Sequence, residues 1–301
     1  MANEITVSSA ADLFASEVLA NEYLMLLADR DPSILNHPAI FKATASSTNS
    51  NVIAVPHVGL GGYDLLTPHT PGSEIANTAL TDDSTDVTLA HRTKRYSMTD
   101  MARYVTQGIL GPPAFAQDLV IASAQTMISL IAGITATFTA TSGATGVALT
   151  WAKVLEAKAK LGAAQANGPL LMVVHPVTWG QLEANALGLG VVAAETNAGI
   201  VNSGLQAYKG RWFGIDCFVS AHCPLINSDA DYAGGLFGPG ALAYADQALV
   251  DEADPNIRSF GVSRLERVRE GGKQSTSYVF SYVSGASKAI DAAGVKLFGD
   301  A

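Results

Sequence analysis

The sequence predicts an α+β fold that combines one long helix, an extended β-hairpin and a mixed α/β region. Three observations lead to this prediction. Residues 113–135 are apolar at helical spacing, and residues 52–98 carry strand-like segments at both ends of a Gly- and Pro-rich stretch. Residues 150–250 then alternate between helical and strand patterns. The order of these parts is the basis for the analysis that follows.

The composition of the chain indicates large buried or covered surfaces. The 301 residues suffice for one large or two ordinary domains, and only 15% of them are charged. A typical soluble domain carries about 25% charged residues. Because charge is depleted at the centres of subunit interfaces, we expect either a large core or surfaces that other subunits cover.

The charge balance excludes some classes of function. Eighteen basic side chains face 27 acidic ones, for a net charge of −9. A dedicated nucleic-acid binder needs clustered Lys and Arg, so we do not expect this chain to be one. A protein wall that merely lies near nucleic acid is still possible.

The N-terminus lacks the pattern of a signal peptide. The longest uncharged stretch, residues 119–152, is interrupted by Gly, Ser and Thr, which favours a buried helix over a membrane span.

The N-terminal segment is predicted to be a short helix followed by a loose strap. Residues 9–28 have an amphipathic pattern, and Ser9 with Asp12 resembles a capping box. Residues 30–51 read as irregular because they are rich in Ser, Thr, Asn and Pro. The pair of segments is either an arm or an ordinary terminal helix packed on its own core, and composition leaves both open.

Residues 52–98 are predicted to run out and back as an extended hairpin. A strand is expected at residues 52–55, and returning strands at 86–90 and 93–97. A loop of this length is uncommon unless it has a function. An isolated hairpin buries little of its own surface, so we expect it to lie on a neighbour.

The clearest helix is predicted at residues 113–135. Pro112 and Pro113 suit a helix start, where a missing amide donor is harmless. The segment is apolar on most sides, which predicts burial on more than one face. A Thr- and Ser-rich linker, residues 135–146, follows it.

Residues 150–204 are predicted to contain two helices with a buried strand between them. Thr150 is expected to cap a helix through residue 166. Its inward-facing residues are predicted to be Trp151, Val154, Leu155 and Leu161. A buried strand at 170–174 leads through His175 and Pro176 into a second helix with Trp179 and Leu182, and residues 188–204 are expected to form a loop.

The remaining chain is predicted to be mainly strands. Candidates are residues 211–220 and 235–244, each bounded by Gly or Pro. Two further strands, residues 257–268 and 275–282, are expected to form a hairpin because Gly271 and Gly272 lie between them.

No catalytic constellation is found. The sequence has no phosphate-binding glycine loop, no paired-His zinc helix and no nucleophile elbow. One cluster could carry chemistry, as a nucleophile pair or as part of a metal site. It consists of Cys217, His222 and Cys223. A zinc site needs four ligands, and the cysteines are separated by about 20 Å if extended, too far for a disulfide. Buried small side chains are the favoured interpretation, so we predict no catalytic, cofactor or metal residue.

Three short passages in the C-terminal half carry a resemblance to a known family. Residues 209–220, closing at Pro224, have the pattern of a small loop, a glycine, an apolar strand and a serine. Residues 234–238 form a strand that ends in Phe-Gly, and residues 267–271 fit a hairpin between two long strands. Together with the order of the parts, they resemble the tailed-bacteriophage major capsid proteins of the Hong Kong 97-type fold.

The resemblance implies a division of the chain into four parts. Residues 1–51 would be the N-terminal arm and residues 52–98 the extended loop. Residues 99–140 and 255–301 would form a peripheral domain with the spine helix at 113–135. Residues 141–254 would form an axial α/β domain.

The resemblance also implies the function. The chain would be a major capsid protein, not an enzyme, that self-assembles into the hexamers and pentamers of an icosahedral phage head. Its partners would be copies of itself, separate scaffolding and portal proteins, a cement or decoration protein, and packaged double-stranded DNA bound without sequence specificity. We expect assembly in the host cytoplasm, a final location in the virion and no membrane contact. Because residues 52–91 contain no Lys, we expect no isopeptide crosslink from the loop.

Three alternatives stay open at this point. The first is an encapsulin-like shell that uses the same fold without a genome. The second is an α/β enzyme that uses Cys217 and His222. The third is a secreted adhesin or surface-layer protein, against which the absent export signal argues.

The charged residues of the hairpin region yield a specific interface hypothesis. Three acidic side chains of the loop, Asp82, Asp83 and Asp86, have no basic neighbour in the preceding sequence back to Lys42. We expect them to meet basic residues of an adjacent subunit, either Arg92, Lys94 and Arg95 or the group Arg258, Arg264, Arg267 and Arg269. The alternative is that all of these charges are simply solvated.

Overall fold

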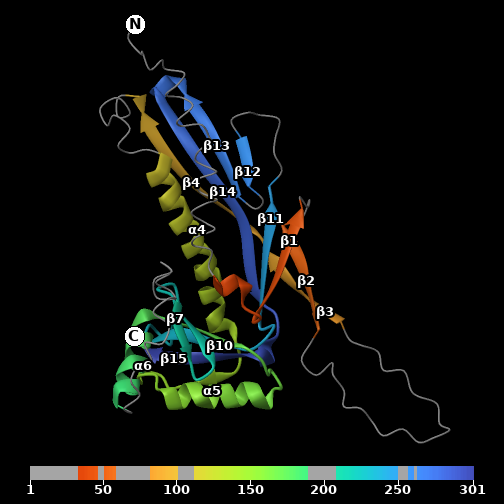
Figure 1. Cartoon of the computed structure of the whole chain (residues 1–301), viewed down its shortest axis with the longest axis vertical. Coiled ribbons are helices and arrows are strands. Elements are labelled where there is room, and N and C mark those ends of the chain that lie inside the picture. Colours follow the sequence, from red (N-terminus) through yellow and green to blue (C-terminus); the bar gives the residue numbers. More distant parts are fainter. Residues whose placement is uncertain are drawn as a thin grey trace, which may run out of the picture.

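The computed structural model describes residues 33–46, 51–58, 82–100, 112–188, 208–249, 257–260 and 263–301. The predicted helix at 9–28, the middle of the extended loop and most of the predicted loop at 188–204 lie outside the described residues. The fold is α+β, as predicted, and it is drawn out along one axis (Figure 1).

The described strands follow one another along the chain in the order β1 (Ile40–Ser46), β2 (Val52–Val58), β3 (Asp82–Thr88), β4 (Ala90–Thr99), β5 (Thr141–Ser142), β6 (Leu170–Val174), β7 (Tyr208–Trp212), β8 (Ile215–Val219), β9 (Leu225–Ile226), β10 (Asp231–Phe237), β11 (Leu242–Ala248), β12 (Ile257–Phe260), β13 (Ser263–Glu270), β14 (Ser275–Lys288) and β15 (Gly294–Asp300). The described α-helices are α4 (Pro112–Ile134), α5 (Trp151–Ala163) and α6 (Pro176–Gly188). None of these helices is long and apolar enough to cross a membrane.

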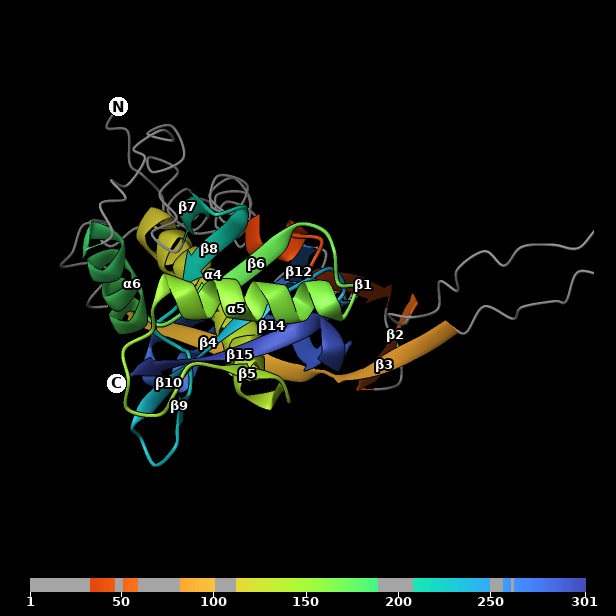
Figure 2. The same cartoon turned by 90° about the horizontal axis from the view of Figure 1, so that it is seen from below.

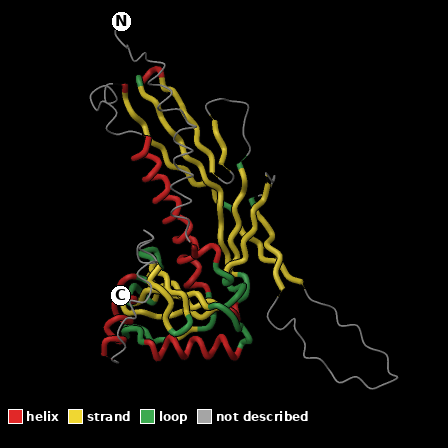
Figure 3. Tube along the Cα trace, viewed as in Figure 1, coloured by secondary structure: helices red, strands yellow, loops and turns green. Residues whose placement is uncertain are grey.

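A long sheet runs along the upper part of the molecule, with α4 beside it (Figures 1 and 3). Its strand order is β1-β11-β14-β13-β12, and β4 also pairs with β14. Aromatic side chains alternate along β14, and Tyr278, Phe280 and Tyr282 are buried. The predicted spine helix is confirmed, and it packs against β14. Its buried residues join this sheet to the core.

The hairpin of β2 and β3 is antiparallel, as predicted, but its base lies on its own subunit. The predicted returning strand at 93–97 is not part of this hairpin, because it belongs to β4 and pairs with β14. Val55, Val87 and Leu89 are buried against Ala243 and Ala245 of β11. The expectation that the hairpin buries little of its own surface is therefore wrong for this part. The apolar alternation of β2 and β3 gives one face that the sheet can cover.

A second, seven-stranded sheet forms the base of the molecule, in the order β5-β15-β10-β6-β8-β7 with β9 beside β10. Every residue of β6 is buried, which confirms the predicted core strand. Seen from below, α5 lies across one face of this sheet (Figure 2). Both α5 and α6 contact β15.

Two predicted strands are each interrupted by a turn. Residues 211–220 form the end of β7 and all of β8, because Phe213 and Gly214 have φ values of 51° and 80° and reverse the chain. Residues 235–244 are divided between β10 and β11, which lie in different sheets. The change of sheet occurs at Gly240, whose φ is +71°.

Two more predictions of local structure need correction. Residues 40–46 are not part of a loose strap but form β1, which pairs in parallel with β11. Residues 257–268 are not one strand but an antiparallel pair, β12 and β13. In both cases the partner strand supplies backbone hydrogen bonds that composition does not reveal.

The helix after residue 150 is confirmed, but it ends at Ala163 and not at residue 166, and two further details differ. Thr150 occupies the N-cap position, but its side chain makes no capping hydrogen bond. Trp151, Val154 and Leu161 are buried as predicted, whereas Leu155 is 42% exposed. The sheets also place four strands differently from the implied domain division. β1, β4 and β11 lie in the long sheet, and β15 lies in the seven-stranded sheet.

Candidate subunit-interface surfaces

The acidic residues of the hairpin lie on β3, at the end that leads to the loop. Asp83 and Asp86 are exposed, and Asp83 Oδ1 accepts a hydrogen bond of 2.8 Å from the Ser84 amide. Asp82 is in register with Val58. Among the described residues, neither Asp83 nor Asp86 has a basic side chain within ion-pair distance. These two carboxylates are therefore available to a partner.

The basic residues gather on the long sheet. Residues 90–99 and 263–288 carry eight basic and two acidic side chains, whereas the rest of the chain carries ten basic and 25 acidic ones. β4 and β13 lie on either side of β14 over most of its length. The sheet is thus a basic region of an acidic protein, and its charge suits an acidic partner.

Several of these basic residues already have acidic partners within the subunit. Lys94 Nζ lies 2.5 Å from Asp118 Oδ2 and so connects β4 to α4. Arg269 makes two hydrogen bonds to Asp100, of 2.6 Å and 2.7 Å. Such bidentate pairs are the better defined of the surface ion pairs.

Arg95 belongs to a small polar network on the opposite side of the sheet from Lys94. It pairs with Glu270, and its Nη2 donates to Ser277 Oγ at 2.9 Å. The Ser277 side chain is fully buried and also hydrogen-bonds Ser97. This network joins β4, β14 and β13.

The other basic residues of the interface hypothesis differ in the partners that they have within the subunit. Arg92 donates a hydrogen bond of 2.7 Å to the Ser284 carbonyl, and Arg264 lies 3.8 Å from Glu266. Arg258 lies on β12 opposite Leu265. Arg267 is half-buried, and no acidic side chain of the described residues lies within ion-pair distance of it. Pairing between subunits therefore stays a prediction, with Arg267 as its best-placed cation.

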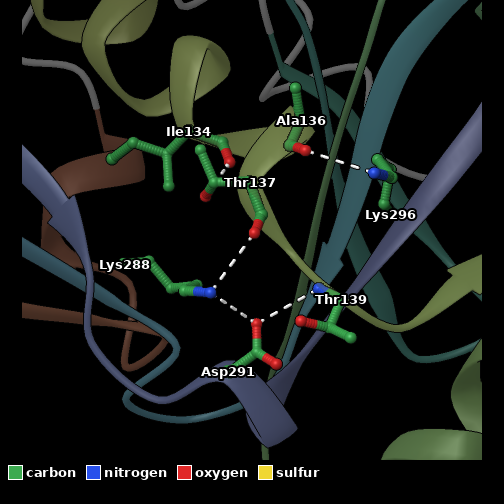
Figure 4. Close-up of polar contacts among 7 residues, drawn as sticks. All are labelled: Ile134, Ala136, Thr137, Thr139, Lys288, Asp291 and Lys296. Carbon is green, nitrogen blue, oxygen red and sulfur yellow. Dashed lines mark hydrogen bonds and ion pairs between the residues drawn. The ribbon is translucent and has the colours of Figure 1, made fainter. Parts of the chain in front are cut away.

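A polar joint that the sequence did not predict closes the end of α4 (Figure 4). Lys288, the last residue of β14, donates to the Thr137 carbonyl at 3.2 Å and pairs with Asp291 at 2.7 Å. Lys296 of β15 donates to the Ala136 carbonyl at 3.2 Å. Two ammonium groups thus meet the carbonyl end of the helix, where its dipole favours cations.

The carboxylate of Asp291 is held in its ionised form at this joint. Partial burial opposes ionisation, but hydrogen bonds from Lys288 and from Thr139 outweigh it and lower the pKa of the Asp291 carboxyl below its usual value. The Lys288 and Asp291 pair has the i, i+3 spacing that a sequence can reveal. Its backbone partners are about 150 residues away and cannot be read from the sequence.

The cysteine cluster does not form a reactive site. Cys217 and Cys223 are free and buried, and burial raises the pKa of each thiol to about 12. The neighbouring His222 is exposed. No group of three or more metal-ligating side chains occurs among the residues that the structure describes. The cysteines are buried small side chains, as expected from the sequence.

The arrangement is similar to that of solved phage structures over most of the chain. A chain from Mycobacterium phage Che8 matches with a TM-score of 0.52 at 16% identity, over 83% of this chain and 85% of that chain. The capsid of Ralstonia phage GP4 matches with a TM-score of 0.58 at 13% identity, over 87% of both chains. The protein has the Hong Kong 97-type capsid fold.

The same fold is shared by a shell protein of another kind. The SrpI encapsulin complex of Synechococcus elongatus PCC 7942 matches with a TM-score of 0.57 at 12% identity, over 86% of this chain and 85% of that chain. No protein-family profile and no curated protein sequence matches this chain. At these identities the likeness establishes the fold, and the function follows as a proposal.

Proposed function

We propose that this protein is the major capsid protein of a tailed bacteriophage and assembles into the hexamers and pentamers of an icosahedral head. The observation that carries the proposal is the likeness to the capsid of Ralstonia phage GP4 over 87% of both chains. It extends over most of the chain and is not confined to one domain. The role is structural, and no step of it requires catalysis.

The physical basis of assembly is repeated contact between identical subunits. Head-to-tail contacts that close on themselves produce rings, and each must be large enough to offset the freedom lost on association. We place acidic residues Asp82, Asp83 and Asp86 of one hairpin against the basic long sheet of the next subunit. The eight basic and two acidic side chains of residues 90–99 and 263–288 support this placement.

Electron microscopy of the purified chain tests the proposal. We expect ring-shaped capsomers or closed shells, and a chain that stays monomeric at high concentration would overturn it. A gene neighbourhood with portal and terminase genes is expected for a phage capsid. Its absence, with closed shells still formed, would favour the encapsulin-like alternative.

The charge pairing has its own test. The double variant Asp83→Lys/Asp86→Lys is expected to lower capsomer yield several-fold, because like charges would then face each other. Adding Arg267→Glu to this variant is expected to restore part of the yield. The isosteric control Asp83→Asn/Asp86→Asn should give a capsomer yield between those of the wild type and the Lys double variant. Unchanged yield in the Lys variant would mean that these carboxylates are only solvated.

The remaining partners follow from this role. A phage head of this type is built with a scaffolding protein, a portal and, where the shell needs reinforcement, a cement protein. It encloses double-stranded DNA without reading its sequence. We propose assembly in the host cytoplasm and a final location in the virion. Mass spectrometry of purified virions would identify the chain as an abundant component.

A further inference from the structure

The two helices of the base each expose an apolar face that nothing in the described part of the chain covers. On α5 this face consists of Ala152, Leu155, Ala159 and Gly162, all of them exposed. Spacings of three and four residues place them on one side of the helix. The opposite side, with Val154 and Leu161, is buried in the core. The exposed face is therefore a real surface and not the end of a frayed helix.

The same pattern recurs on α6. Val177, Gly180, Ala184 and Leu187 are exposed at spacings of three and four residues, while Trp179 and Leu182 are buried. Leu187 is 74% exposed and Val177 is 45% exposed. Large apolar side chains gathered on one face of a soluble protein usually mark an interaction site.

An aromatic residue enlarges the α5 face. Phe213 is 44% exposed, and its ring centroid lies 5.1 Å from that of Trp151. Lys158 Nζ donates to the Phe213 carbonyl at 2.8 Å. Because Trp151, Leu155 and Lys158 follow one row along the helix, Phe213 adjoins the exposed face. Its φ of 51° is rarely adopted by a bulky residue, so the turn holds this ring outward at some cost.

The charges that border the two faces are complementary. The α5 face is bordered on one side by Lys158, next to Leu155 and Gly162, and on the other by Glu156, which already pairs with Lys153 and Lys160 within α5. Glu183 is the only charged residue of α6, and it lies next to Gly180 and Leu187. Because Glu156 is paired within α5, Lys158 is the charge at the border of the α5 face that can meet Glu183 at the border of the α6 face.

We propose that α5 of one subunit packs against α6 of the next subunit, and that this helix-to-helix contact closes the capsomer ring. The inference rests on the proposed shell function. The small residues in both faces let two helix backbones approach closely, and Leu155, Phe213 and Leu187 supply the apolar area. Because the two faces differ, the contact is head-to-tail, as a ring requires. α5 is the outermost described element at the base of the molecule, so a neighbour can reach it (Figures 1 and 2).

Crosslinking within assembled particles tests the contact. Leu155→Cys and Ala184→Cys place one thiol at the centre of each face, and a short bismaleimide joins thiols that come together. The native Cys217 and Cys223 are buried and do not compete. We expect a ladder of covalent oligomers up to a closed ring from the double variant. A mixture of the two single variants should give dimers only, and each single variant alone should give monomers.

A matched control and the contrary outcomes complete the test. Leu225 is 46% exposed and lies outside both faces, so Leu225→Cys with Ala184→Cys should give no ladder. Dimers from one single variant would show a two-fold contact and overturn the proposal. So would crosslinks confined to one chain, or none at all, in particles that are visible by electron microscopy. If the wild-type chain forms no particles, the proposed function fails as well, which distinguishes the two failures.

Discussion

Lys288 Nζ lies 2.7 Å from Asp291 Oδ1, and the same ammonium group donates to the carbonyl of Thr137, in the 3-10 turn (Thr135–Thr137) that follows α4. The pair thus joins the last strand of the long sheet to the spine helix. Figure 4 shows both side chains beside the Thr137 carbonyl. How firmly the strand and the helix are held together depends in part on one lysine.

Replacing Lys288 by Met is expected to destabilise the subunit by about 1 kcal/mol. The change removes an ion pair and a charged hydrogen bond, but both are partly exposed, so the loss is smaller than for buried groups. Denaturant unfolding of the purified chain measures it. Lys153→Met is the control, because Lys153 pairs only with Glu156 on the surface of α5 and its loss should cost less. Equal stability of the two variants would show that the joint contributes no more than a surface ion pair.

The contribution of Asp291 to stability is expected to disappear in acid. Its folded-state pKa lies below the ordinary value of 3.8, so the group stabilises the folded state above that pH and loses this effect as the pH falls through the folded pKa. The difference in unfolding free energy between wild type and Asp291→Asn should be at most about 1 kcal/mol near neutral pH, since the side chain is 41% exposed. The difference should shrink as the pH falls through the folded-state pKa and be lost below it. A difference that grows in acid would contradict this account.

Gly285→Ala is expected to loosen the hairpin from the sheet. A Cβ at this position would lie 2.2 Å from the Thr88 carbonyl oxygen, so backbone and not a flexible side chain would have to move. Overpacking of this kind costs about 2 kcal/mol. Gly133→Ala in α4 meets nothing within 4 Å and should instead stabilise the helix by up to about 1 kcal/mol. Thermal unfolding of both variants, and proteolysis of the hairpin, would show the contrast.

How far the sequence predicts this fold can be seen from particular residues. The apolar runs that became α4 and β6 were predicted within one residue of their bounds, because a long periodic pattern leaves few alternatives. Turns were harder. Phe213 in a left-handed conformation has no sequence signal, since that position normally takes Gly or Asn.

The surfaces were less predictable than the core. Leu155 was predicted to face inward because periodicity identifies apolar positions and cannot tell a core from a surface that a partner covers. The acidic partners of the basic residues could not be identified from the sequence either. Asp100 and Arg269 are 169 residues apart in the sequence, and only the pairing of β4 and β13 with β14 brings them together.

Cys217 and Cys223 are expected to resist thiol reagents until the protein unfolds. With a pKa of about 12, roughly one thiol in ten thousand is ionised at about pH 8. Both side chains are also buried, so reagents in solution do not reach them. Maleimide labelling should therefore follow the rate of unfolding. Cys217→Ala should assemble as wild type does, at a modest cost in stability for the smaller side chain. Rapid labelling of the folded protein at one cysteine would indicate an activated thiol, and it would reopen the enzyme interpretation that uses Cys217 and His222.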